Sequence, residues 1–224
     1  MSCQNSHNAK FTFIHVNTKF RSNYYTTSST DFNYQFPNSY SNVTSLKLDS
    51  ICIPNTWYLF SSEKKNNVFF IETNDTCNGI ELHQIVIPDG NYSVDQLEVF
   101  LNKTYLYLSD NTNGLSNIKF SIHENSLKSI FSVLDGTSNS FKFDLKFAHS
   151  ELKNICFGVG WILGFRYGKY TDITSYVMSE GLYDGGGDRY IYFCLDDFNH
   201  SSLNPHEVCF EKYSINESVL AKIY

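Results

Sequence analysis

Hydrophobic and polar residues alternate along most of this chain with a period of two. Ser140–Phe147 is the clearest segment, because its phenylalanine and leucine side chains all fall on one side while Lys142, Asp144 and Lys146 fall on the other. A strand places successive side chains on opposite faces, so this pattern predicts a strand with one buried face and one solvated face.

The same reading predicts about ten short strands. Asn117–His123 and Leu127–Leu134 are separated by a polar turn and are expected to form a hairpin. The remaining predicted strands are Phe11–Phe20, Asp31–Phe36, Val43–Ile53, Val68–Thr73, Ile80–Ile87, Tyr190–Leu195, Val208–Lys212 and Ser218–Ile223. Several are apolar on both faces, which suits the interior of two packed sheets. Many short strands with polar connections predict an all-β sandwich or barrel.

One helix is signalled clearly. Ser93 is a candidate N-cap, and Gln96 completes a capping box. Apolar residues then recur at helical spacing, which predicts a helix over Val94–Leu108 with one apolar face. A second short helix or tight turn is expected over Cys156–Leu163.

The segment Tyr167–Asp188 is polar and rich in glycine. We interpret it as an exposed, mobile loop rather than a domain boundary. No long linker or internal repeat divides the sequence, so the chain is expected to form a single domain over residues 1–224.

Composition narrows the function classes. The 224 residues carry a net charge of −6, and the chain lacks the basic stripe that duplex nucleic acid requires. No apolar run approaches the roughly 18 to 20 residues of a membrane helix, and the polar N-terminus does not resemble a signal peptide. The six cysteines form no C-x-x-C pair. We therefore expect reduced, structural thiols, with Cys52 and Cys194 inside strands.

Catalytic motifs are missing from the sequence. It contains no nucleophile elbow, metalloprotease helix or Walker loop. Gly158, Gly160 and Gly164 miss the dinucleotide-binding spacing by one residue and lack a βαβ context. No catalytic or cofactor-binding residue is predicted, and we expect the protein not to be an enzyme.

Two groups of side chains raise the question of a metal. Asp196, Asp197, His200 and His206 offer oxygen and imidazole ligands, but their spacing matches no known ligand pattern. A strand-ending turn at Asp196 is the simpler interpretation. Asp184 and Asp188 flank three glycines and could hold a cation. A flexible, solvated loop has the same composition. We therefore predict no metal site and no cofactor.

Three aromatic segments have the character of corners in a β-chain: Ser50–Phe60, Ile87–Ser93 and Gly160–Arg166. In the first, Trp57 and Tyr58 are candidates for stacking on sugars or bases. The favoured interpretation is that Pro54 ends strand pairing while Trp57 and Phe60 close the corner of the sandwich.

These segments also carry a resemblance. The ordered motifs are Phe20-Arg-Ser-Asn, Ser29-Thr-Asp-Phe-Asn-Tyr34, Ile53-Pro-Asn-Thr-Trp-Tyr58, Ile87-Pro-Asp-Gly-Asn-Tyr92, Ile162-Leu-Gly-Phe-Arg166, Asp188-Arg-Tyr-Ile-Tyr192 and Asp196-Asp-Phe198. Together they resemble the minor capsid and penton-type proteins of nucleocytoplasmic large DNA viruses over about residues 11 to 224. The resemblance implies a jelly-roll-like antiparallel β-sandwich with one or two short helices, assembled in an icosahedral capsid. It brings no catalytic residues.

Similar chains continue with a Tyr-x-Gly-Pro stretch and further strands, whereas this one stops at Ala221–Tyr224. The single domain is therefore either shorter than those relatives or truncated at the C-terminus, with an exposed edge.

The expected function is that of a virion structural protein, a minor capsid or penton protein made in the host cytoplasm. Its partners would be the major capsid protein and other minor capsid subunits, with a homopentamer if it occupies vertices. Arg21–Thr30 and Tyr167–Asp188 are the predicted contact segments, because Tyr, Ser, Thr and Gly adapt readily to a partner surface. The alternative is a carbohydrate-binding jelly roll used for attachment, with Trp57 in its site.

Overall fold

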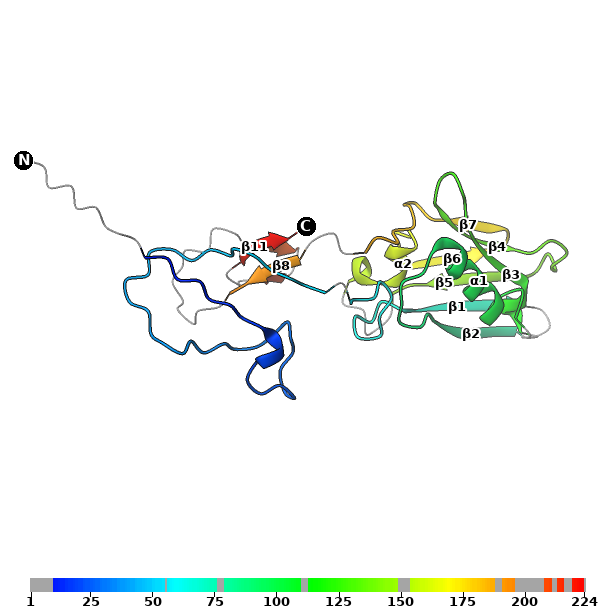
Figure 1. Cartoon of the computed structure of the whole chain (residues 1–224). Coiled ribbons are helices and arrows are strands. Elements are labelled where there is room, and N and C mark those ends of the chain that lie inside the picture. Colours follow the sequence, from blue (N-terminus) through cyan, green and yellow to red (C-terminus); the bar gives the residue numbers. More distant parts are fainter. Residues whose placement is uncertain are drawn as a thin grey trace, which may run out of the picture. The chain divides into compact units, whose positions relative to one another are not determined.

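The structure is a computed structural model, and it describes residues 10–54, 56–75, 79–109, 113–148, 154–187, 191–195, 208–210, 213–215 and 219–223. The chain divides into two compact units, Met1–Lys47 and Leu48–Tyr224. Figure 1 shows the chain coloured along the sequence, with α1, α2 and most of the strands labelled. Each unit is described by itself.

The Leu48–Tyr224 unit contains a four-stranded antiparallel sheet with the order β2-β1-β5-β6. The strands are β1 (Val68–Asp75), β2 (Gly79–Val86), β5 (Lys142–Lys146) and β6 (Lys169–Ile173). In the centre of this sheet, Ile71 on β1 lies opposite His83 on β2 and Leu145 on β5. The predicted alternation in Ser140–Phe147 is confirmed, because Phe143 and Leu145 are buried while the lysines beside them are partly exposed.

A second antiparallel sheet has the order β3-β4-β7. It consists of β3 (Ile118–Ile122), β4 (Ser129–Val133) and β7 (Tyr176–Met178). The predicted hairpin is confirmed, since β3 and β4 pair with Phe120 opposite Phe131. Their ring centroids lie 4.8 Å apart.

The hydrophobic core lies between the two sheets and is dominated by aromatic side chains. Phe69 on β1 contacts Phe131 on β4 edge to face, with centroids 6.0 Å apart. Burying a phenylalanine side chain contributes about 1.5 to 3 kcal/mol. The fully buried phenylalanines are Phe60, Phe69, Phe120, Phe131, Phe141, Phe143, Phe147 and Phe165. These antiparallel sheets and their few helices confirm the all-β prediction.

The predicted helix is present as α1 (Val94–Thr104), and its capping box is complete. The Ser93 hydroxyl accepts from the Gln96 amide at 3.3 Å, and the Gln96 side chain accepts from the Ser93 amide at 3.0 Å. The helix ends earlier than predicted because Leu106 shares the Leu101 carbonyl with Tyr105. The predicted turn over Cys156–Leu163 contains a 3-10 turn, η3 (Ile155–Phe157), and then α2 (Val159–Ile162). The other 3-10 turns are η1 (Thr18–Phe20) and η2 (Gly114–Asn117).

The prediction of a mobile loop over Tyr167–Asp188 is wrong. This segment contains β6 and β7, and it buries the side chains of Ile173 and Tyr183. Both strands lie at sheet edges, where polar residues can face solvent. Polar composition therefore concealed two short strands whose pairing depends on β5 and β4.

The three strands predicted before Pro54 are also wrong. None of the described residues 10–54 belongs to a strand, although they carry the alternating pattern of Phe11–Phe20, Asp31–Phe36 and Val43–Ile53. Alternation gives a segment two faces, but a strand also requires a neighbour to complete its hydrogen bonds. Cys52, expected inside a strand, is exposed here.

Four short strands follow the sandwich. β8 (Ile191–Cys194) pairs with β11 (Val219–Ile223), and β9 (Val208–Phe210) pairs with β10 (Tyr213–Ile215). Three of them confirm strands expected from the sequence, and β10 was not predicted. Cys156 and Cys194, like Cys52, are free thiols.

Candidate interaction surfaces

Two of the three aromatic segments singled out in the sequence meet at one corner of the sandwich. Phe60 and Gly90 form an isolated antiparallel bridge, with N–H···O distances of 3.1 and 3.0 Å. The Asn91 side chain accepts from the Leu59 amide at 2.7 Å, and Asp89 accepts from the amide and the hydroxyl of Ser62. Short polar side chains thus satisfy the backbone where the strand pairing ends.

The third aromatic segment is connected to this corner through the chain around Tyr183. The Tyr183 hydroxyl donates to the Tyr92 carbonyl at 3.0 Å, and the Asp184 amide donates to the Ile162 carbonyl at 2.9 Å. Burial, reinforced by the Asp184 charge, raises the pKa of Tyr183 to about 12. The hydroxyl therefore stays protonated near neutral pH and acts as a structural donor.

The turn after α2 depends on close backbone contacts. Gly164 has a φ of +92°, and a Cβ at this position would lie 2.3 Å from the Gly181 carbonyl oxygen. The Arg166 guanidinium stacks on Trp161 at 4.0 Å from the ring centroid and donates to the Trp161 carbonyl at 3.1 Å. The guanidinium is therefore engaged by contacts within its own turn.

Trp57 does not close the corner as expected. Phe60 is fully buried, but Trp57 is 36% exposed and Tyr58 is 50% exposed. The prediction is therefore correct for Phe60 and wrong for Trp57. The two rings are adjacent in sequence, and each is exposed enough to stack on another group.

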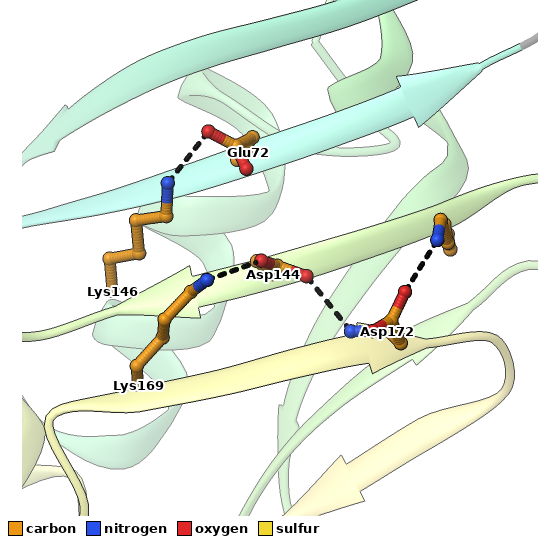
Figure 2. Close-up of polar contacts among 6 residues, drawn as sticks. Glu72, Asp144, Lys146, Lys169 and Asp172 are labelled. Carbon is orange, nitrogen blue, oxygen red and sulfur yellow. Dashed lines mark hydrogen bonds and ion pairs between the residues drawn. The ribbon is translucent and has the colours of Figure 1, made fainter.

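The outer face of the four-stranded sheet carries a ladder of ion pairs, which Figure 2 shows across β1, β5 and β6. Lys146 contacts Glu72 at 2.6 Å, and Lys169 contacts Asp144 at 3.1 Å. A third pair joins Lys142 to Asp172. Three lysines thus face three carboxylates, so the face is locally neutral. Among the described residues, these three pairs contribute no net charge to the face.

Tyr170 fixes the start of β6. Its hydroxyl donates to Glu180 at 2.7 Å and accepts from the amides of Arg166 and Tyr167. Burial and the hydrogen bond to Glu180 raise its pKa to about 12. With its donor and acceptor positions both in use, this hydroxyl is unsuited to acid–base chemistry.

The predicted contact segment Arg21–Thr30 forms a closed loop around the Arg21 side chain. The guanidinium donates to the carbonyls of Thr18 at 3.0 Å, Tyr24 at 3.1 Å and Thr27 at 3.0 Å. It also lies 4.0 Å from the centroid of the Tyr24 ring. The loop thereby leaves Tyr25 almost fully exposed.

An open depression of about 540 Å³ lies along α1. The residues that line it include Tyr92, Gln96, Phe100 and Lys103. Its described lining contains no carboxylate, imidazole or thiol. Aromatic faces with a few polar groups suit stacking and hydrogen bonding better than proton transfer.

Within the part of the chain that the structure describes, no three His, Cys, Asp or Glu side chains gather closely enough to hold a metal ion. The candidate metal ligands Asp196, Asp197, His200 and His206 lie outside the described residues, as does Asp188. A search of the described helices finds none with the length and apolar character of a membrane span.

No protein-family model matches the chain, and comparisons with curated proteins and with solved structures give no match either. The architecture therefore rests on the chain's own strands and core, which define an all-β, sandwich-like protein.

Proposed function

We propose that this chain is a non-enzymatic structural subunit of a virion capsid, a minor capsid or penton-type protein with a jelly-roll-like sandwich. The ordered aromatic motifs that resemble such proteins support the proposal. The contact between Ile87–Ser93 and the segment around Phe60 supports it further, because both segments build a corner of the sandwich.

The observation that carries the proposal is the number of exposed aromatic side chains in the described part of the Met1–Lys47 unit. The side chains of Phe11, Phe13 and Phe20 are 80 to 84% exposed, and Tyr25 is 98% exposed. Apolar side chains gathered outside a core mark surfaces that bind other proteins, and interfaces are enriched in aromatic residues. An assembly subunit needs such a segment, whereas a self-contained enzyme does not.

In this proposal the sandwich provides a rigid block and the Met1–Lys47 unit provides contacts. Its partners are the major capsid protein and other minor capsid subunits, with no role for nucleic acid. A penton protein would form a homopentamer at each vertex, while a minor capsid protein would join capsomers from the inside. Symmetry then repeats each contact around the shell.

The decisive experiment places the chain in the density of the virion. Density at the vertices supports the penton role, and density beneath the capsomers supports the minor capsid role. Absence from the particle refutes the proposal. Separately, the full-length variant Phe11→Ser/Phe13→Ser should lose incorporation into particles while its circular dichroism is unchanged. Phe157→Ser, which replaces an exposed phenylalanine of the Leu48–Tyr224 unit, is the matched control.

A carbohydrate-binding attachment module is the second candidate, and the exposure of Trp57 and Tyr58 favours it. Stacking of sugars on aromatic faces requires such exposed rings. On a glycan array, this function predicts binding that Trp57→Ala abolishes without changing the melting temperature. Retention of binding by Trp57→Ala, or no binding by the unmodified chain, would remove this candidate.

A further inference from the structure

The two sheets of the sandwich have four edge strands, and the edge at β3 is blocked by α1. The Asn102 side chain donates to the Phe120 carbonyl at 2.8 Å and accepts from the Phe120 amide at 2.9 Å. Glu98 accepts from the Ile122 amide. Side chains of α1 thus bond the backbone amides and the carbonyl of β3 that another strand would use.

The edges at β6 and β7 are unsuited to pairing for different reasons. In β6, Asp172 has a φ of +54° and the register with β5 shifts between Phe143 and Leu145. Such irregularity and the flanking charges discourage a new strand. β7 is only three residues long.

The edge at β2 lacks these protections along most of its length. Figure 1 shows β2 at the border of the four-stranded sheet. It pairs with β1 in unbroken register over eight residues. Its outer face exposes Ile80 (69%) and Leu82 (57%). A long, regular, apolar edge is the kind that pairs with another strand.

The unpaired backbone groups of β2 form a short, defined set. The Tyr105 hydroxyl bonds the amide and the carbonyl of Val86, which shows that Val86 points these groups away from β1. Alternate residues share that direction, so Ile80, Leu82 and Gln84 also point theirs outward. Among the described residues, none forms a hydrogen bond with the outward amides and carbonyls of Ile80, Leu82 and Gln84. Tyr105 therefore ends the free edge at Val86.

We propose that β2 pairs antiparallel with β2 of a second copy of this chain, with Leu82 on the two-fold axis. The free set Ile80, Leu82 and Gln84 is symmetric about Leu82. An antiparallel copy therefore places Leu82 opposite Leu82 and Ile80 opposite Gln84, with two hydrogen bonds for each such pair. Among centres that pair described residues only, no other uses all the free groups without displacing Tyr105.

Side chains on the other face fit the same register. Glu81 and His83 lie two residues apart, with the Glu81 carboxylate 3.5 Å from the His83 imidazole within one chain. With Leu82 on the axis, each Glu81 lies directly opposite the second copy's His83. The dimer therefore contains two pairs in which a carboxylate acceptor faces an imidazole that can donate. Such directly opposed, complementary pairs stabilise antiparallel strands. The pairing is independent of the proposed capsid role and joins two four-stranded sheets into one.

Cysteine cross-linking of the full-length chain tests this register. Residues opposed in a hydrogen-bonded antiparallel pair have Cα atoms about 5.5 Å apart, which a disulfide can bridge. Leu82→Cys should therefore yield a covalent dimer on mild oxidation. Ile80→Cys and Gln84→Cys should not, because each opposes the other rather than itself. Dimer formation in the unmodified chain gives the background of the native cysteines. Equal cross-linking of all three variants, or none by Leu82→Cys, overturns the proposal.

Sedimentation equilibrium tests the association itself. Leu82→Lys places like charges face to face on the axis and should weaken the dimer about tenfold or more. Thr171→Lys adds the same charge to the exposed surface of β6 and should leave the dimer unchanged. A monomeric unmodified chain, or a dimer indifferent to Leu82→Lys, refutes β2 self-pairing. The second result would point instead to pairing through another segment.

Discussion

Gly160 lies against the ring of Phe147 so closely that a Cβ on Gly160 would fall 2.6 Å from Cγ of Phe147. The ring cannot withdraw easily, because it is fully buried and stacks on Phe165 with centroids 4.9 Å apart. The glycine in the third aromatic segment is therefore a packing requirement between α2 and the core.

Gly160→Ala should destabilise the fold by about 1 to 3 kcal/mol, even though alanine favours helices over glycine. Urea unfolding followed by circular dichroism measures the change. Gly186→Ala is the matched control, since its new Cβ would meet only a carboxylate oxygen of Asp184 at 3.4 Å. A Gly160→Ala protein as stable as the original would contradict this account.

Asn102→Ala should destabilise the protein by about 1 to 3 kcal/mol, because it leaves the buried backbone of Phe120 without partners. Lys103→Ala, at an exposed position of the same helix, is the control. Asn102→Asp keeps an acceptor for the Phe120 amide but turns a second oxygen toward its carbonyl. Its stability deficit should therefore shrink at acid pH, where a protonated carboxyl can donate. A deficit that is independent of pH would show that the amide donor is unimportant.

Much of the fold could be predicted from short-range patterns in the sequence. The capping box of Ser93 and Gln96 predicted the start of α1, because those contacts lie within one turn of the chain. The period-two pattern predicted β5 and the β3–β4 hairpin, whose buried faces match the alternation. Patterns that depend on one segment and its nearest neighbour are readable in this way.

Signals that depend on distant partners were not readable. Asp31–Phe36 alternates as well as β3 does, yet it has no described strand beside it. β6 was hidden because its exposed charges pair with β5, as in Lys169 with Asp144. The bridge between Phe60 and Gly90 and the occupation of the β3 edge by Asn102 arise from tertiary contact. Neither could be inferred from spacing.

The stability of the protein should fall as the pH is lowered through the titration range of His83. Burial, partly offset by the Glu81 carboxylate, lowers the pKa of His83 below its usual 6.5, and its ring lies 3.1 Å from the Thr73 hydroxyl. The unfolded chain therefore binds a proton at a higher pH than the folded one. This contribution to stability is fully present above pH 6.5 and is lost as the pH falls toward the folded pKa.

Urea unfolding between about pH 8 and about pH 5 measures this dependence. His83→Gln should flatten the part of the slope that arises at this site, and His123→Gln, at an exposed position, should leave it unchanged. An identical slope in the His83→Gln protein would show that the folded state does not resist protonation there.

Removal of residues 1–47 should leave the sandwich folded. Every described core residue lies between Leu59 and Tyr183, so the truncated chain keeps the whole aromatic core. We expect the free energy of unfolding to change by no more than about 0.5 kcal/mol, as for changes away from a core. Urea unfolding and near-ultraviolet circular dichroism of residues 48–224 check this. A truncated protein that loses its near-ultraviolet signal would show that the Met1–Lys47 unit is needed for folding. A folded one would show that the exposed rings of Phe11 and Phe13 are not needed to form the core.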